Sequence, residues 1–564
     1  MLDKITMIWH DLMVIKRNPK TGSQPPAEAP AKVEIDAGGI AELKAFLLEM
    51  VQRGDGAEAI DLVIDLIACL RDDNNAKAIR IAKLLRERFG RKGEKVDREQ
   101  LDLFLQSVDA DDKVAEDAGN ELPELPAAPE PTPRERKRTG RNPLPAHLPR
   151  RDNVIAVPDE QRPCPNCGGE RHAIGYECSE LLELVPAHFF VRVDKREKLA
   201  CRACEEGVSV ADPADKPIDK GRPGPGLLTD VAVSKYADHQ PLYRIAQRYG
   251  RLGVDIAPST LMSWIAAVAS MLEPLHKEIT RRVLCAYMLG IDDTHIKVLD
   301  RSKDGNVKRG HLWPIVGYVD GRRDLVSYHY SPDWKGEHPQ ALLASRTGFV
   351  QADAYKGINK LFQGADSKVT RVGCFAHVRR KYKEALDSGD LRAAVALKLI
   401  GRLYEVERRA GDLGLDVAAR QLLREEYARP ALVDLKAWAA KLHPRVRPTS
   451  PLGKALGYTI NQWLTLEVYV TDGAIPIDNN GVENEIRPIG VGRRNWLFAG
   501  SDAGGERAAV IYTMLGCCRL HRVDPAAWLC DVLEKLSGDW KASRLEELLP
   551  SHWQPAHVAN DAAA

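Results

Sequence analysis

The sequence contains no long hydrophobic run. No stretch of about 18 apolar residues occurs among its 564 residues, so no transmembrane helix is expected. The N-terminus has short apolar clusters but lacks the small-residue cleavage site of a signal peptide. We therefore expect a cytoplasmic protein that makes no membrane contact. In that reducing compartment its 11 cysteines would serve metal binding or packing rather than disulfides.

The chain also has almost no net charge. The formal value of +1 neither indicates nor excludes a nucleic-acid partner, because a neutral chain can carry a locally basic surface. The basic residues do cluster along the sequence, at 134–141, 150–151, 379–381 and 493–494. The sequence therefore predicts basic patches on an otherwise neutral protein.

The chain is too long for a single hydrophobic core, so we expect a multidomain α+β protein. The first part of the chain is predicted to contain a disordered N-terminus over 1–36, helices over 37–108 and a Pro-rich, then basic linker over 109–154. The helices over 37–108 form either a packed hairpin or an oligomerising coiled coil. A four-cysteine zinc ribbon-like module over 155–210 and a helix-turn-helix-like region over 211–278 are expected next, followed by a β-rich core over 279–380, a helical insertion over 381–472, an acidic segment over 473–502 and C-terminal helices over 503–564.

Two Cys-x-x-Cys pairs mark the predicted zinc module. The pairs are Cys164 with Cys167 and Cys201 with Cys204, and a strand is expected between them at 189–193. At this spacing four thiolates can converge on one tetrahedral Zn²⁺. Four cysteine ligands leave no open coordination position, so the metal would be structural. The alternative is four unrelated reduced thiols.

Basic and helical segments flank this module. Arg136, Lys137, Arg138 and Arg141 precede it and either contact a DNA backbone or are simply solvated. After it, helices are expected over 226–239, from Pro241 as the first helical residue, and from Pro258. This succession resembles a helix-turn-helix. The third helix has few basic or amide side chains for base reading, so a helical bundle that braces the core is the alternative.

The β-rich core carries two acidic strand ends. Strands are expected at 283–291, 312–319, 325–330, 348–352 and 369–374. Asp292 and Asp293 follow the first of them, and Asp353 follows a strand that should lie beside it. Because neighbouring residues of a strand point to opposite faces, only one of Asp292 and Asp293 can share a site with Asp353.

A third acidic segment follows the predicted helical insertion. A short helix should start at Asn479 or Asn480 and be ended or kinked by Pro488. Glu483 and Glu485 lie about 200° apart on it, so both cannot point at one site. Three carboxylates delivered from distant segments suit a pair of Mg²⁺ ions. This succession describes an RNase H-like α/β core with a helical insertion.

Several motifs occur in this order. They are Asp-Asp-Thr at 292–294, Asp-Ala-Tyr at 353–355, Cys-Phe-Ala-His-Val-Arg-Arg-Lys at 374–381, Asn-Asn-Gly-Val-Glu-Asn-Glu-Ile-Arg-Pro at 479–488 and Gly-Arg-Arg-Asn-Trp-Leu-Phe at 492–498. Together with the cysteine pairs, they make the chain resemble the transposase of the insertion sequence 66 family, a group of bacterial DDE transposases. The resemblance runs from about residue 80 to 540.

The resemblance implies a catalytic triad of Asp292, Asp353 and Glu483 that binds Mg²⁺ or Mn²⁺. Such an enzyme binds the terminal repeats of its element as double-stranded DNA, cuts there to free a 3′-OH, and joins that end to target DNA. The resemblance further implies a homo-oligomer, small accessory proteins encoded by the same element, and a bacterial cytoplasmic protein that is nucleoid-associated when bound to DNA.

Two positions depart from the family pattern. Asp293 stands where the family has Glu, and the pattern assigns the catalytic role to Asp292 beside it. Asn484 stands where the family has Arg directly after the catalytic Glu. The loss of this basic side chain makes a catalytically weakened or domesticated DNA-binding protein the alternative function. A structure-specific nuclease of the same fold is the third.

The remaining candidates are expected to contact DNA. They are His377, Arg379, Arg380, Lys381, Arg487, Arg493, Arg494 and Trp496. The arginines would neutralise phosphates, and the indole would offer a stacking surface. Solvation of the charges and burial of Trp496 in the core are the alternatives.

Overall fold

The computed structural model describes most of the chain from residue 209 onward. The described residues are 45, 48, 49, 51–54, 63, 123–126, 150, 166, 169, 181–182, 187–199, 209–300, 302, 307–353, 356–363 and 368–555. The expected disordered N-terminus, nearly all of the predicted oligomerisation helices and the basic linker residues lie outside them. So do the four candidate zinc cysteines.

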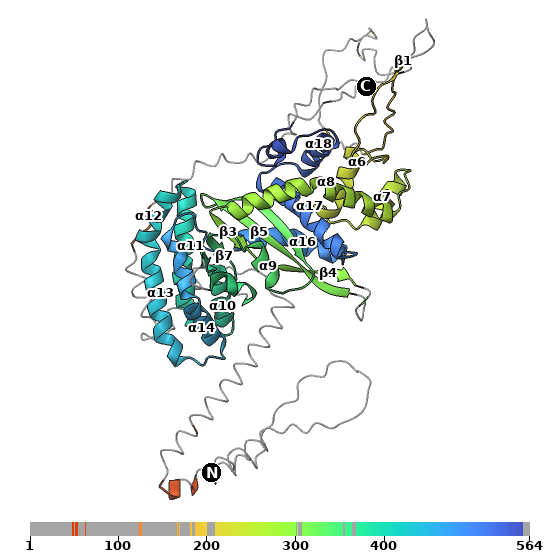
Figure 1. The fold of residues 1–564 in the computed structure, drawn as a ribbon. Coiled ribbons are helices and arrows are strands. Elements are labelled where there is room, and N and C mark those ends of the chain that lie inside the picture. Colours follow the sequence, from red (N-terminus) through yellow and green to blue (C-terminus); the bar gives the residue numbers. More distant parts are fainter. Residues whose placement is uncertain are drawn as a thin grey trace.

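A six-stranded mixed sheet forms the centre of the fold (Figure 1). Its strands are β3 (Met288–Ile291), β4 (Thr294–Leu299), β5 (Val307–Val319), β6 (Arg322–Ser331), β7 (Gly348–Gln351) and β8 (Val369–Val372). β5 pairs antiparallel with β3, β4 and β6. β7 and β8 then extend the sheet in parallel beyond β3.

β3 and β4 behave as one interrupted strand. Ile291 pairs with Ile315 and Thr294 pairs with Leu312, so the register along β5 is continuous across the gap. The gap lies opposite Pro314, which has no N–H to donate to the ladder. Only a long contact of 3.5 Å joins the Asp292 N–H to the Pro314 carbonyl. The break therefore falls at the two aspartates.

The strand predicted at 283–291 was placed too early at its N-terminal end. Residues up to Cys285 belong to helix α8 (Pro258–Cys285), and β3 starts only at Met288. A short apolar run does not by itself distinguish a buried strand from a buried helix, so the end of α8 was merged with β3.

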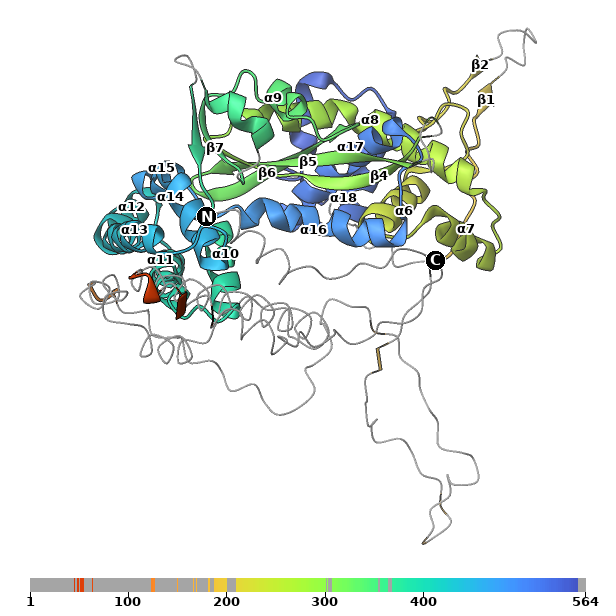
Figure 2. The same ribbon diagram turned by 90° about the horizontal axis from the view of Figure 1, so that it is seen from below.

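Helices α8 and α16 (Asn480–Asn495) cover opposite faces of the sheet (Figure 2). Two glycines permit their close approach. A Cβ on Gly317 would lie 3.0 Å from the Ala286 Cβ, next to the end of α8. A Cβ on Gly290 would lie 2.6 Å from Val482 Cγ2 in the first turn of α16. Larger side chains at either position would push the helix away from the sheet.

Helix α17 (Asp502–Leu520) runs along the outer strand β6. Thr513 Oγ1 accepts the Tyr328 N–H at 2.9 Å, and Cys517 Sγ donates to the Val326 carbonyl at 3.3 Å. One turn later, His521 Nε2 lies 2.7 Å from the Asp324 carbonyl. These side chains, spaced four residues apart, engage backbone groups that an edge strand would otherwise expose to pairing with another chain.

Two shorter helices precede α8. They are α6 (Pro225–Tyr236) and α7 (Leu242–Arg251), and α6 packs against α8 and α18 (Pro525–Ser537). Pro241 is the N-cap of α7 rather than its first helical residue. The third helix of the predicted helix-turn-helix is α8, whose second half packs on β5 and β6. That packing favours the bracing role for this half, and base reading by its first turns stays a prediction.

A small hairpin lies in the region of the predicted zinc module. β1 (Lys198–Leu199) pairs antiparallel with β2 (Ser209–Val210). The segment between these strands carries Cys201 and Cys204. The strand predicted at 189–193 is wrong, because those residues belong to no strand or helix.

The segment after β8 is helical. Its helices are α10 (Phe375–Asp387), α11 (Ala393–Asp412), α12 (Val417–Tyr427), α13 (Arg429–Leu442), α14 (Pro451–Asn461) and α15 (Trp463–Leu466). Shorter elements elsewhere are α9 (Glu337–Leu342) and the 3-10 turns η4 (Lys356–Phe362), η5 (His443–Arg445), η6 (Glu467–Thr471) and η7 (Ala542–Leu548). Within the described part of the chain, no helix is both long and apolar enough to cross a membrane.

Buried Arg424 joins this helical block to the acidic segment. Its guanidinium is fully buried and forms a double hydrogen bond with Glu407 of α11, at 2.7 and 2.8 Å. It also donates to the carbonyls of Tyr469 and Asp472 at 2.8 and 2.7 Å. A single side chain of α12 thus ties α11 to the chain that leads into Asp478 and α16.

Candidate active site

Two aspartates lie at the same edge of the sheet. β3 and β7 are parallel, and Gly290 pairs with Gln351. Asp292 and Asp353 each follow two residues later, so they leave their strands side by side and on the same face. Gly290 marks that face, because its missing side chain makes room for Val482 of α16. Asp292 and Asp353 therefore face the helix that carries Glu483.

Buried amides hold the start of α16 over these strand ends. Asn479 donates through Nδ2 to the Ile291 carbonyl at 3.1 Å, and its backbone N–H donates to Cys374 Sγ at 3.3 Å. Gln351 donates to the carbonyls of Gly373 and Pro476 at 2.9 and 3.1 Å. Asn479 is the N-cap residue but its side chain does not cap α16. It connects α16 to β3 instead.

Asp293 points to the opposite face of the sheet. Its Oδ2 lies 2.7 Å from His311 Nδ1, and its Oδ1 accepts from Trp334 Nε1 at 3.0 Å. The His311 and Trp334 rings are stacked, with centroids 5.8 Å apart. Both carboxylate oxygens of Asp293 thus have partners on the side of α8. Strand alternation separates the two adjacent aspartates, as the sequence required.

The two glutamates of α16 also diverge. Glu485 is 1% exposed and pairs with Arg519, with Arg323 at 3.4 Å and with the Tyr328 hydroxyl at 3.2 Å. Glu483 is 27% exposed, and its carboxylate lies 3.9 Å from His377 Nε2 and 3.7 Å from Arg380 Nη2. Glu485 therefore holds the fold together, whereas Glu483 remains accessible.

Electrostatics connect the three carboxylates. Burial, followed by the negative charges of Asp353, Asp293 and Glu483, raises the pKa of Asp292 to about 7, against the lowering effect of the Asp293 N–H. Asp353 and Glu483 also oppose the lowering of the His377 pKa, which burial causes first and the Arg380 charge second. Crowded carboxylates of this kind are hard oxygen donors that suit a divalent cation.

The carboxylates are close without forming a complete metal cage. In the described part of the chain, no group of three or more His, Cys, Asp and Glu side chains already converges as ligands of one ion. A Mg²⁺ ion keeps several waters and needs only one or two carboxylates, so this arrangement still fits shared binding of two ions.

We expect the metal-free protein to lose stability as the pH rises. The folded pKa of Asp292, about 7, exceeds the ordinary value of 3.8. Its contribution to stability is therefore fully present below about pH 4 and lost as the pH rises through about 7. The thermal unfolding midpoint without divalent metal should fall across this range, and Asp292→Asn should flatten the profile. An unchanged pH slope in the variant would contradict the assignment.

One stripe of α16 leads away from Glu483. Arg487, Gly490 and Arg494 follow at spacings of 4, 7 and 11 residues, which places all four on one helix face at about 100° per residue. Arg487 and Arg494 are exposed. Pro488 was predicted to end or kink the helix. Ending the helix is wrong, because α16 continues to Asn495, and the kink stays a prediction. Buried residues in the turns on both sides of Pro488, including Glu485 and Ile489, hold them against the fold.

Several residues predicted to contact DNA have structural partners. Arg493 Nη1 donates to Thr294 Oγ1 and to the His295 carbonyl, both at 2.8 Å, and so attaches α16 to β4. Trp496 packs against the core, and Lys235 Nζ lies 5.4 Å from its ring. Lys381 Nζ lies 4.7 Å from the Tyr458 ring. Of the remaining candidates, His377 and Arg380 lie near Glu483.

The sequence missed several supporting residues. Arg371 donates to the backbone carbonyl of Asp353 and, at 2.7 Å, to Asn359. Gln351 and Asn479 join strands and helix behind the carboxylates. The sequence gives no signal for Arg371. For Gln351 and Asn479 it shows only a polar side chain two residues from Asp353 and four residues from Glu483. The sequence predicts Asn479 or Asn480 as the residue that caps the helix. It gives no sign of the contact between Asn479 and Ile291, because a hydrogen bond across 188 residues has no local signature.

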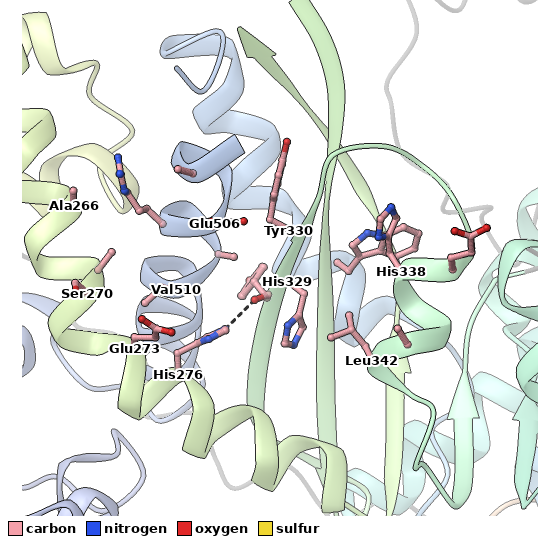
Figure 3. A pocket seen from close by; sticks show the side chains of 18 residues that line it. Ala266, Ser270, Glu273, His276, His329, Tyr330, His338, Leu342, Glu506 and Val510 are labelled. Atoms are coloured by element: carbon pink, nitrogen blue, oxygen red, sulfur yellow. Dashed lines mark hydrogen bonds between the residues drawn. The ribbon is translucent and has the colours of Figure 1, made fainter. Parts of the chain in front are cut away.

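A cavity of about 860 Å³ lies on the other face of the sheet (Figure 3). α8, β6, α9 and α17 surround it. His276 and His329 lie together in its wall, and His276 Nε2 is 3.0 Å from the Tyr328 carbonyl. Burial lowers the pKa of His276, and it lowers that of His329 to about 3. Two imidazoles whose protonation burial opposes therefore line a cavity on the side of the sheet away from Glu483.

Comparison with protein families gives matches along most of the chain. Residues 220–507 match the model described as the transposase IS66 family, and residues 513–551 match the IS66 C-terminal element. Residues 161–205 match the zinc-finger binding domain of transposase IS66. Residues 79–152 match the model described as transposase C of IS166 homeodomain.

Curated relatives extend over nearly the same length. The chain is 33% identical over 511 residues to the uncharacterized protein y4hP of Sinorhizobium fredii, covering 86% of this chain and 90% of the relative. It is also 33% identical to y4jD of the same organism, covering 74% and 83%. A short match of 46% over 51 residues joins it to YuaK of Escherichia coli. The IS66 family model alone covers about half of the chain, at residues 220–507, and the chain belongs to the IS66 family of DDE transposases.

Proposed function

We propose that the chain cuts DNA at the ends of an insertion sequence and joins the freed 3′-OH ends to target DNA, with Asp292, Asp353 and Glu483 as catalytic residues. The observation that carries the proposal is the parallel pairing of β3 with β7, which places Asp292 and Asp353 side by side below the helix that carries Glu483. The raised pKa of Asp292, to which burial contributes most and the other carboxylates add, supports it. Groups with strongly shifted pKa values concentrate at functional sites.

We assign the core to the RNase H-like class. The sheet order supports the assignment. β6, β5 and the interrupted β3–β4 strand form an antiparallel meander, and β7 and β8 continue in parallel. The helical block from α11 to α15 then separates β8 from the helix that carries Glu483. This is the succession that the sequence predicted for such a core with an insertion.

Mg²⁺ or Mn²⁺ would be held by Asp292, Asp353 and Glu483. A bound pair of such ions supplies charge neutralisation for the attacking and leaving oxygens of the phosphodiester. The chain itself provides the rigid support, because Asn479, Gln351 and Arg371 fix the three segments that carry the carboxylates. Arg380 lies close enough to Glu483 to neutralise it before a cation is bound.

The two adjacent aspartates provide a matched test. Asp292→Asn should abolish Mg²⁺-dependent cleavage of duplexes that carry the inverted repeats flanking the gene, while duplex binding persists. Asp293→Asn keeps side-chain hydrogen bonding to His311 or Trp334 and should retain most of the cleavage. Cleavage should be followed as release of 3′-OH ends on denaturing gels. Active Asp292→Asn with inactive Asp293→Asn would refute the assignment.

A second candidate function is DNA binding without efficient catalysis. Asn484, which follows Glu483 on α16, favours it because the family has Arg at this position. Under this hypothesis purified wild-type protein binds end DNA without cutting it, and Asn484→Arg restores cleavage. Efficient cleavage and strand transfer by the wild-type protein would eliminate it.

We propose a structural Zn²⁺ bound by Cys164, Cys167, Cys201 and Cys204. Support comes from the β1–β2 pairing, which brackets the second cysteine pair, and from the donor set of four thiolates. Elemental analysis should find about one zinc per chain. Cys201→Ser combined with Cys204→Ser should remove it, whereas Cys285→Ser, which changes an exposed thiol elsewhere, should not. Full zinc content in the double variant would contradict the proposal.

The assembly of the protein stays a prediction. Homo-oligomers formed through the helices of residues 37–108, accessory proteins of the same element, and DNA contacts by Arg136, Lys137, Arg138 and Arg141 all involve parts of the chain largely outside the described residues.

A further inference from the structure

An exposed apolar tip follows the C-terminal end of α16. Leu497 and Phe498 are 58% and 43% exposed, although their neighbours Trp496 and Ala499 pack against the core. Leu497 has a φ of 62°, in the left-handed region that non-glycine residues rarely adopt. Strained backbone that presents two large apolar side chains to solvent is not explained by folding and points to a binding role.

The backbone holds this tip in place on both sides. The Trp496 N–H donates to the Gly492 carbonyl at 3.0 Å, so the last turn of α16 is closed. On the far side, Ala499 forms a parallel bridge to Val298 of β4. The Ala499 N–H donates to the Lys297 carbonyl at 2.8 Å. The tip is therefore a braced projection rather than a loose loop.

Basic side chains surround the tip. Extending the Val298–Ala499 bridge by one residue places Phe498 beside Lys297, which pairs across the strands with Arg309. Lys297 and Arg309 are exposed, as is Arg494 near the end of α16. Two acids lie nearby. Asp502 is paired with Lys308 at 2.7 Å, and Asp300 accepts from the Ser302 hydroxyl at 2.6 Å. An apolar tip within a positive surface suits a polyanion with stacked apolar groups, which is duplex DNA.

We propose that Leu497 and Phe498 form a wedge that enters a base step of duplex DNA lying along α16. Proteins that kink DNA insert such apolar side chains between bases and hold the flanking phosphates with basic residues. Glu483, Arg487 and Arg494 share one face of α16, so DNA that follows this face from the carboxylates reaches the wedge. The inference rests on the proposed function for the choice of DNA as ligand.

Helix geometry gives the position of the distorted step. From residue 483 to the end of α16 at residue 495 the helix advances about 18 Å at roughly 1.5 Å per residue, so the tip two residues further on lies about 20 Å from residue 483. This distance corresponds to about six base pairs at roughly 3.4 Å each. The wedge would therefore unstack DNA about six base pairs from the phosphate at the carboxylates, where the duplex must remain accessible for cutting.

Binding measurements test the wedge without any need for catalysis. Two duplexes of equal length differ only in whether a central TA step is paired or mismatched, and fluorescence anisotropy gives the affinity for each. Wild-type protein must unstack the paired step and should bind the mismatched duplex about tenfold more tightly, since the mismatch removes part of the unstacking cost. The variant combining Leu497→Ala and Phe498→Ala should bind both duplexes equally.

A matched control separates the wedge from general apolar exposure. Leu464 is 82% exposed on α15, and Leu464→Ala should keep the tenfold preference. Because Leu497 and Phe498 lie outside the hydrophobic core, their double variant should unfold at the wild-type temperature. Retained affinity for the paired duplex together with a lost preference supports the wedge.

Other outcomes overturn the proposal. The wedge is refuted if the double variant prefers the mismatched duplex as strongly as the wild-type protein does, or if the wild-type protein shows no such preference. Either result leaves the proposed cleavage activity untouched. A variant that changes only its oligomeric state in light scattering shows that the tip contacts another copy of the chain. Absence of DNA binding by the wild-type protein would refute the wedge together with the proposed function.

Discussion

Replacing Glu483 with Gln is expected to lower the rate of DNA end cleavage by at least about a thousandfold. Neutralising one carboxylate removes a hard metal ligand at the site, and metal-borne charge stabilisation is worth several kcal/mol. Duplex binding should change little, because Glu483 is a partly exposed side chain that no buried contact requires. Single-turnover cleavage of end DNA in Mg²⁺ measures the effect.

Glu485→Gln is the matched control on the same helix. Glu485 is buried and pairs with the partly exposed Arg519 and Arg323. Its neutralisation removes the carboxylate that holds both guanidinium groups and should lower the unfolding temperature. Glu483→Gln should leave that temperature nearly unchanged. If Glu483→Gln destabilises the protein while Glu485→Gln abolishes cleavage in folded protein, the roles of the two residues have been reversed.

Arg424→Met is expected to destabilise the folded core by about 3 kcal/mol or more. The change leaves Glu407 without its cation and removes one donor from each of the Tyr469 and Asp472 carbonyls. Breaking one partner of a buried pair costs about 3–5 kcal/mol. All three bonding nitrogens of Arg424 have partners in the native protein. Denaturant unfolding followed by circular dichroism of the full chain measures the change.

A surface ion pair supplies the comparison for this stability test. Arg429 pairs with Glu425 while their side chains are 48% and 40% exposed, and pairs of this kind contribute about 0–1 kcal/mol. Arg429→Met should therefore change the free energy of unfolding very little. If Arg424→Met and Arg429→Met lower the free energy of unfolding equally, the buried pair of Arg424 and Glu407 contributes no more to stability than the exposed pair.

Sequence periodicity anticipated most of the element types in the described core. It separated the β-rich part from the helical part because hydrophobic spacing is local and differs between strand and helix. Sequence periodicity gave wrong element boundaries where the local pattern was ambiguous or where tertiary contacts determined the structure instead. The end of α8 was interpreted as part of β3, and Pro488 did not end α16, whose flanking turns are held by tertiary contacts.

The candidate site shows the same division at single residues. Alternation along the strand already required that Asp292 and Asp293 face opposite sides, and helix phase required the same of Glu483 and Glu485. Neither argument could say which member of each pair faces which side. The partners that occupy Asp293 and Glu485, His311 and Arg519, come from other strands and helices.

By itself, the sequence determined the family of this protein, the acidic positions and the phase relation between neighbouring acids, because motifs, spacing and periodicity are properties of the chain. Only the tertiary structure decided which acids come together, how Asn479 and Gln351 hold them, and that Leu497 and Phe498 project from the surface. Those features depend on the pairing of β3 with β7 and on the packing of α16 against the sheet. Such contacts join residues far apart in sequence, and local patterns carry no information about them.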